Sequence, residues 1–114
     1  MKKMKFAIYD DINREERMID YSESGGLLSF VWNDEKIELS CKRELFDFRK
    51  ESSESILSIT YKNGKIESSI LLKSENIIFD IPITEFEYCY EKKHVLFKYK
   101  IDEDLIFHTI EITY

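Results

Sequence analysis

The stretch that most constrains the fold runs from His94 to Tyr114, where apolar and polar side chains alternate. A period of two is the signature of a β-strand with one buried face. The side chains that share this apolar face are Val95, Phe97, Tyr99 and Ile101 in the first half, and Ile106, His108, Ile110, Ile112 and Tyr114 in the second. An acidic segment separates the halves, so the pattern predicts a β-hairpin.

The pairing register of this hairpin follows from its faces, because a slip of one residue would turn every side chain to the wrong side. A three-residue loop would set Tyr99 against Phe107, an apolar face against a polar one. A four-residue loop, Asp102–Leu105, is common in hairpins and keeps the apolar partners together. It pairs Ile101 with Ile106, Tyr99 with His108, Phe97 with Ile110 and Val95 with Ile112. We therefore expect His108 beside Tyr99.

The rest of the chain repeats this pattern in short segments separated by turn residues. Asn63-Gly64 between two alternating segments is a strong hairpin signal, since a type I′ turn needs positive φ at both central residues. Residues 10–17 are aperiodic and fit a loop or one helical turn with Asp11 as N-cap. Pro82 lacks an amide donor and belongs at an edge, a bulge or a strand end. The further predicted strands cover residues 5–9, 17–22, 27–32, 36–42, 45–49, 55–62, 65–73, 77–84 and 85–91.

The composition agrees with an all-β fold. The 114 residues include 8 Phe and 7 Tyr, which favour strands, and Ala, the best helix former, is nearly absent. Short links make sequence neighbours pair, which gives an antiparallel meander. We expect this meander to close into a small β-barrel of about eight to ten strands, because closure removes exposed edges. The length predicts one domain over residues 1–114.

Charge excludes several classes of function. The net charge of −6 opposes nucleic-acid binding and attachment to an anionic membrane, both of which need a basic face. No apolar run approaches the roughly 18 residues of a membrane helix. The start of the chain is basic, but Asp10 interrupts the apolar part that a signal peptide would need after it.

The two cysteines give a further expectation. Cys41 and Cys89 lie on faces of opposite character, so two thiols are expected rather than a disulfide. We therefore expect a cytoplasmic protein.

The C-terminal half resembles a known family. The segments 79–84, 86–88, 94–101 and 106–114 resemble the end of the YwiB-like bacterial proteins, a family of unknown function, and residues 18–26 resemble its opening strand. The resemblance implies a calycin-like β-barrel, the architecture of lipocalins and fatty-acid-binding proteins. It implies no catalytic residues, because the family has no established activity.

No strong catalytic or metal motif is present. His108 lies on an apolar face and has two interpretations. As a functional residue it would contact a ligand or act as a base. As a structural residue it would be a buried imidazole hydrogen-bonded to Tyr99 or to a backbone carbonyl, which is the more common case. His94 is expected in solvent. The predicted register puts the two histidines on opposite faces, so they form no metal site. The acidic clusters at 10–11 and 102–104 fit solvated turns better than a Ca²⁺ site.

Two functions from different classes remain. In the first, the barrel binds a small apolar or amphipathic molecule, with Trp32, Tyr99 and His108 near the ligand. The aromatic residues of the inner face would either line such a cavity or fill it. In the second, the protein is an interaction module or homodimer that works through a strand edge or an outer patch containing Leu96, Phe107 and Leu71. Neither function involves an enzyme or a cofactor.

Overall fold

The computed structural model describes residues 2–102 and 106–114, so most of the predicted Asp102–Leu105 loop and of the acidic cluster at 102–104 lies outside the described residues. The described residues form strands and turns, and they contain no helix with the length and apolar character needed to cross a bilayer. The strands are β1 (Lys2–Tyr9), β2 (Arg14–Ser24), β3 (Leu27–Trp32), β4 (Glu35–Lys42), β5 (Leu45–Glu51), β6 (Ser55–Lys62), β7 (Lys65–Leu72), β8 (Ile77–Asp80), β9 (Ile83–Glu91), β10 (His94–Ile101) and β11 (His108–Thr113).

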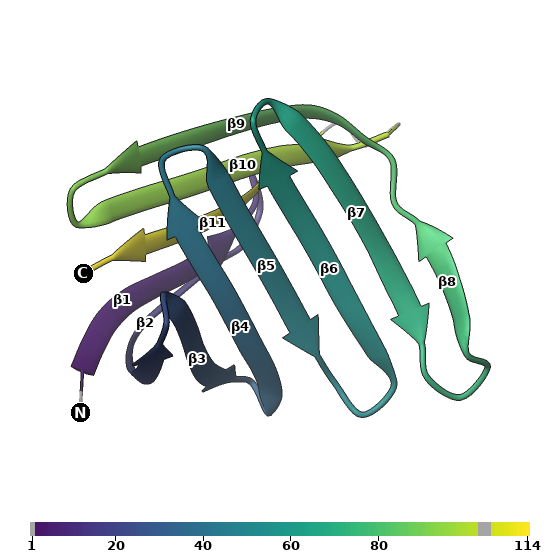
Figure 1. Ribbon diagram of the computed structural model, residues 1–114, viewed down its shortest axis with the longest axis horizontal. Coiled ribbons are helices and arrows are strands. Elements are labelled where there is room, and N and C mark those ends of the chain that lie inside the picture. Colours follow the sequence, from purple (N-terminus) through teal and green to yellow (C-terminus); the bar gives the residue numbers. More distant parts are fainter. Residues whose placement is uncertain (1, 103–105) are drawn as a thin grey trace. The chain divides into compact units, whose positions relative to one another are not determined.

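The all-β antiparallel class is confirmed, with eleven described strands rather than about eight to ten (Figure 1). Their hydrogen-bonded order is β8-β7-β6-β5-β4-β3-β2-β1-β11-β10-β9. Apart from β8 and β9, consecutive strands are neighbours in the sheet, as in a meander. Among the described strands only the β1–β11 pairing joins distant parts of the chain. The strands at the two ends of this order, β8 and β9, are consecutive in sequence and are joined by Ile81 and Pro82.

The contacts divide the chain into two compact units. Unit 1 comprises Met1–Tyr21 and Pro82–Tyr114, and therefore holds β1, most of β2, and β9 to β11. Unit 2 comprises Ser22–Ile81, with the end of β2 and β3 to β8.

Unit 1 is organised around rows of buried side chains that cross three strands. Phe6 of β1 pairs with Ile112 of β11, and Ile112 pairs with Val95 of β10. All three side chains are buried. Removing apolar surface from water stabilises a fold by about 25 cal/mol per Å², so these rows hold β1 against the C-terminal hairpin.

The predicted register of the C-terminal hairpin is confirmed for three of its four pairs: Tyr99 with His108, Phe97 with Ile110, and Val95 with Ile112. The fourth, Ile101 with Ile106, is wrong. β11 begins only at His108, and Ile101 pairs with Ile83 on the other side of β10. The alternating pattern therefore begins at Ile106, two residues before the strand β11.

Unit 2 has its core on β3 to β6. The side chains buried there are Leu28, Phe30, Trp32, Ile37, Leu39, Phe46, Phe48 and Ile59. Leu39 pairs with Leu28 on one side and Phe48 on the other, so one apolar row crosses the sheet. The Asn63–Gly64 hairpin is confirmed: both residues have positive φ, 49° and 81°, and β6 pairs with β7 in the predicted register.

The segment after β1 differs from the prediction. β2 begins at Arg14 and forms a hairpin with β1, so the predicted loop covers only residues 10–13, residues 14–17 belong to a strand, and no helical turn forms in this segment. The carboxylate of Asp10 accepts hydrogen bonds from the backbone amides of Ile12 and Asn13, each at 2.7 Å. Asp10, and not Asp11, thus satisfies the amides of this turn, because a short acidic side chain readily bonds to the backbone two residues further on.

The predicted strand 77–84 is also divided. β8 ends at Asp80 and β9 starts at Ile83, so Pro82 lies between strands, where its missing amide donor costs no ladder bond. Phe79 lies on the alternating apolar face of this segment, yet it is half exposed. β8 has only β7 as a neighbour among the described strands, which explains why alternation alone did not bury it.

Candidate functional site

His108 and Tyr99 lie side by side in unit 1, as the sequence predicts. Their rings stack with centroids 5.4 Å apart and planes 29° apart. The Nε2 atom of His108 is buried. Burial also raises the pKa of Tyr99 to about 12, because a phenolate is poorly solvated there. The pair therefore presents two stacked, flat rings near the end of the C-terminal hairpin.

This pair ends a continuous row of rings across β9, β10 and β11. Tyr88 lies 6.4 Å from Tyr90 and 6.2 Å from Phe97, and Phe97 lies 5.7 Å from Tyr99, measured between ring centroids. Tilted aromatic pairs at such distances are attractive beyond their burial of area. The row holds Tyr99, and through it His108, in a defined position.

A surface hollow of about 390 Å³ lies beside His108. Its wall comes from four elements of unit 1: Ile8 and Tyr9 from β1, Asp10 and Asn13 from the turn, Arg14 and Glu15 from β2, and His108 from β11. The space therefore has an apolar and aromatic side and a side rich in polar groups. Such a mixture of apolar lining and a few polar groups is typical of small-molecule sites.

Asp10 links the turn to His108. The β1–β11 register, continued by one residue, sets Asp10 opposite His108. The pKa of Asp10 is lowered mainly by the amides of Asn13 and Ile12, with a smaller contribution from His108. The sequence alone gives no sign that Asp10 lies near His108, because the strand partner of β11 lies about a hundred residues earlier in the chain.

Trp32, the third predicted ligand residue, belongs to unit 2. It lies at the end of β3, pairs with Glu35 of β4 and is buried. The structure thus brings together Tyr99 and His108, and places Trp32 in the core of the other unit.

The opposite face of unit 1 carries a polar network that the sequence did not reveal. Nε2 of His94 lies 2.6 Å from Oε2 of Glu111, so the expectation that His94 is merely solvated is wrong. The hydroxyl of Tyr9 donates to Oε1 of Glu111 at 3.3 Å, and Arg14 approaches the same oxygen at 3.5 Å. Glu111 therefore joins β10, β11, β1 and β2.

The electrostatics of this network favour an ionised Glu111. Burial raises the pKa of the carboxyl, but the bonds from His94 and Tyr9 and the charge of Arg14 outweigh it, so the net shift is downward. The guanidinium of Arg14 also lies 4.3 Å from the centre of the Tyr9 ring. Tyr9 and Arg14 also line the hollow beside His108, whereas Glu111 and His94 do not.

The residues missed by sequence reasoning are those that line this hollow from β1, β2 and the turn. One signal was available: Asp-Asp-Ile-Asn at 10–13 is turn chemistry, and a tight turn there would have paired Tyr9 with Arg14. The partnership of β1 with β11 had no local signal.

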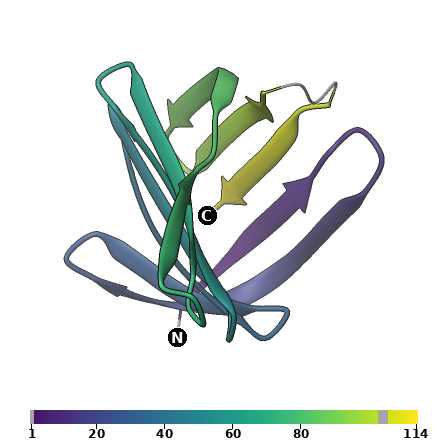
Figure 2. The ribbon, with the colours of Figure 1, turned by 90° about the vertical axis from the view of Figure 1, so that its right-hand side faces the viewer.

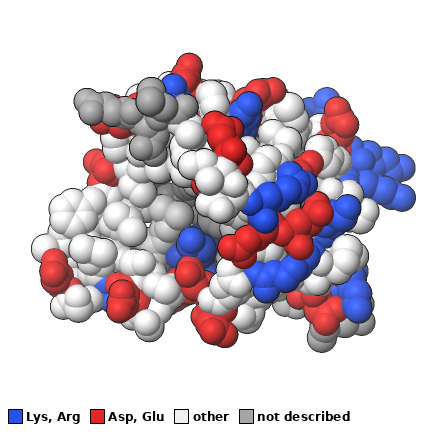
Figure 3. Space-filling view, turned by 180° about the vertical axis from the view of Figure 1, so that it is seen from behind, with Lys and Arg blue, Asp and Glu red and all other residues white. Residues whose placement is uncertain are grey.

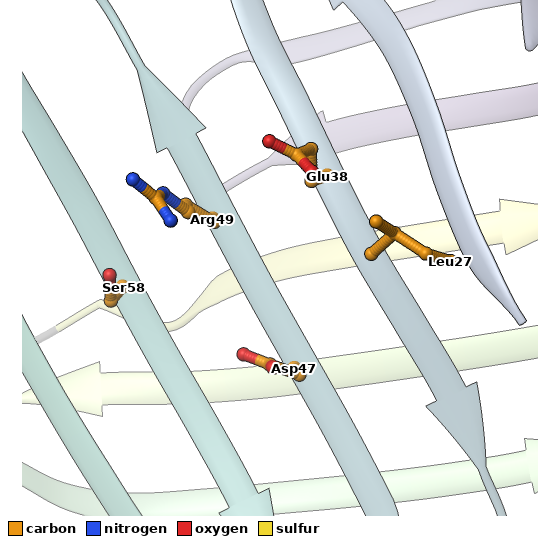
Figure 4. A pocket seen from close by; sticks show the side chains of 5 residues that line it. All are labelled: Leu27, Glu38, Asp47, Arg49 and Ser58. Atoms are coloured by element: carbon orange, nitrogen blue, oxygen red, sulfur yellow. The ribbon is translucent and has the colours of Figure 1, made fainter. Parts of the chain in front are cut away.

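A second hollow, of about 260 Å³, lies on unit 2 (Figure 4). Its lining comes from β3 to β6: Leu27, Glu38, Asp47, Arg49 and Ser58. Arg49 pairs directly with Glu38 and Ser58 across the sheet. The hollow is thus a solvated surface of mixed charge, with Leu27 as its single apolar member.

The described residues hold no group of three or more His, Cys, Asp or Glu side chains suited to a metal ion. The register does place His94 and His108 on opposite faces, as predicted, since His94 pairs with Thr113 and His108 with Tyr99.

The outward apolar residues named from the sequence are less exposed than expected. Leu96, Phe107 and Leu71 are each only partly exposed. Phe107 is covered in part by the ammonium group of Lys98, which lies 4.5 Å from its ring centre. The largest exposed apolar side chains lie elsewhere, on β8 among other places.

The chain matches no protein-family model, no curated protein and no solved structure. The resemblance to the YwiB-like proteins therefore stays a prediction, and function is argued from the residues themselves.

Proposed function

We propose that this protein binds a small amphipathic molecule in the hollow beside His108, without chemical conversion. The proposal rests on one observation: His108, which stacks on Tyr99, lines a hollow of about 390 Å³. Ligand sites in proteins are typically about 300–1,000 Å³, so the space accommodates a small molecule. A calycin-like barrel, with β8 and β9 as its unpaired end strands, belongs to the same proposal and is supported by the antiparallel strand order. A cytoplasmic location is proposed as well and is supported by the two cysteine thiols, which fit a reducing compartment.

The lining suggests how such a molecule would lie. A flat apolar part would contact Ile8 and the imidazole of His108, while a polar head group would reach the side-chain carboxamide of Asn13 and the guanidinium of Arg14. Arg14 is held by Glu16 at 3.1 Å and by Tyr9, so its donors are already oriented. Preorganised groups cost less conformational entropy on binding than mobile ones.

The test is native mass spectrometry of the protein purified from cells, compared with its denatured mass. We expect extra mass in the native spectrum that disappears on denaturation. The two histidines provide a matched pair of variants, because they lie on opposite faces of one sheet. His108→Ala should lose the extra mass, and His94→Ala should keep it.

A fluorescent anilinonaphthalene sulfonate, which is flat, apolar and carries one charged group, is a second probe of the same site. The wild type should bind it at least tenfold more tightly than His108→Ala, with His94→Ala like the wild type. The proposal is refuted when the wild type carries no bound molecule and binds no probe, or when both histidine variants behave alike.

A further inference from the structure

β8 is an apolar strand at one end of the sheet order. All four of its residues are exposed, and three are large and apolar: Ile77, Ile78 and Phe79. Figure 2 shows β8, in green, at the front beside β7. On the face drawn in Figure 3, acidic and basic side chains are interspersed among uncharged ones. Exposed apolar edge strands are unusual, since they offer unpaired backbone groups to other chains.

The hydrogen bonds show which backbone groups of this strand face outward. The amide of Ile81 donates to the carbonyl of Ser68 in β7 at 3.0 Å. In an antiparallel pair every second residue directs its backbone amide and carbonyl toward the neighbouring strand. The backbone groups of Phe79 and Ile77 therefore also point toward β7. The amide and carbonyl of Ile78 therefore point to the open edge.

These features fit a second copy of the same strand. When two copies of β8 pair antiparallel about a two-fold axis through Ile78, each Ile78 exchanges two backbone hydrogen bonds with its counterpart. The same register sets Ile77 opposite Phe79 of the other copy, on one face. Asp80 falls opposite Asn76, so no carboxylates meet. A symmetric interface must be complementary to itself in this way.

The other end strand lacks this property. β9 alternates aromatic residues with Glu85, Glu87, Cys89 and Glu91. Two copies of β9 would bring like charges together, which is a common protection of strand edges against pairing. The acidic charge of the protein therefore opposes association at β9 and leaves β8 as the edge suited to it.

We propose that two copies of this chain associate through β8, in an antiparallel pairing centred on Ile78. Four residues on each side bury less than the roughly 800 Å² per partner of a stable dimer. The association is consequently weak and concentration-dependent.

Sedimentation equilibrium over micromolar to millimolar concentrations tests the proposal. The average mass of the wild type should rise from one chain toward two. Ile78→Lys places two ammonium groups against each other on the symmetry axis and should weaken association at least tenfold. Val31→Lys is the matched control, because Val31 of β3 is 67% exposed and Ile78 is 66% exposed. It should associate like the wild type.

Ile78→Pro is a second variant, since it removes the outward amide without touching a bond to β7. It should also be monomeric, with the circular dichroism of the wild type. A wild type that stays monomeric overturns the proposal and leaves an extended segment of a different protein as the occupant of this edge. Equal loss of association in Val31→Lys also overturns it. His108→Ala should associate normally, which separates this test from that of ligand binding.

Discussion

Glu111→Gln tests the polar network that joins four strands of unit 1. The substitution keeps the shape of the side chain and removes its charge. It weakens one short bond, to His94 at 2.6 Å, and two long ones, to Tyr9 at 3.3 Å and Arg14 at 3.5 Å.

The magnitude follows from the geometry and the exposure. Bonds to charged groups contribute about 1.5–3 kcal/mol when sheltered, and exposed ion pairs about 0.2–1 kcal/mol. The Glu111 side chain is 20% exposed and that of His94 is 36% exposed, so the interaction is neither fully sheltered nor fully exposed. The two long bonds add little. We expect the free energy of unfolding to fall by about 1 kcal/mol, which lowers the melting temperature by roughly 4 °C in a chain of this size.

The effect must also depend on pH in a defined direction. The pKa of Glu111 is lowered from 4.5 in the folded protein. A carboxyl with a depressed folded pKa stabilises the fold above its unfolded pKa, and this contribution is lost as the pH falls through the folded value. The difference between wild type and Glu111→Gln should therefore be full at neutral pH and close below 4.5.

Urea unfolding followed by circular dichroism measures both effects. Glu67→Gln, on an exposed position of β7, is the control for the chemical change itself and should alter stability by less than about 0.5 kcal/mol. Equal stability of the Glu111 and Glu67 variants at neutral pH would refute the reasoning, as would a difference from wild type that persists at low pH.

The remaining predictions concern the ring row and the buried phenol. Phe97→Ala should lower the free energy of unfolding by about 3–5 kcal/mol, because the ring is fully buried. Tyr90→Ala, at the exposed end of the row, should lower it clearly less. Urea unfolding midpoints measure both effects, and equal losses of stability would contradict the packing described. Tyr99 should ionise at about 12 in an absorbance titration, and Tyr99→Phe should remove that step. Because the pKa of Tyr99 is raised above 10.0 in the folded protein, the neutral phenol stabilises the fold fully below pH 10.0, and this contribution is lost as the pH rises through about 12. Ionisation of all tyrosines near pH 10 would contradict this prediction.

Local patterns were enough to place most strands and their faces. Residues 94–101 alternate, and β10 covers the same residues with Val95 and Phe97 buried. Asn63-Gly64 was sufficient for the β6–β7 register, because the turn type fixes which residues face each other. Both signals act between residues close in sequence.

Local patterns failed where burial depends on a neighbour. Ile77 and Phe79 alternate like core residues, yet β8 pairs only with β7 among the described strands and both side chains are exposed. At the other end of the hairpin, alternation suggested a strand from Ile106, but β11 starts at His108. A period of two records which side of a strand is apolar, and not whether anything covers it.

The sequence by itself determined the all-β class, the antiparallel hairpins and the contact of Tyr99 with His108, since each follows from alternation and turn chemistry within about twenty residues. Only the tertiary structure decided that β1 pairs with β11, which brings Asp10 and His108 to one hollow and Tyr9 to Glu111 across 102 positions of the chain. The physical reason is that backbone hydrogen bonds are alike in every strand. The choice of a distant partner depends on how whole apolar faces fit together, and no local run of residues records it.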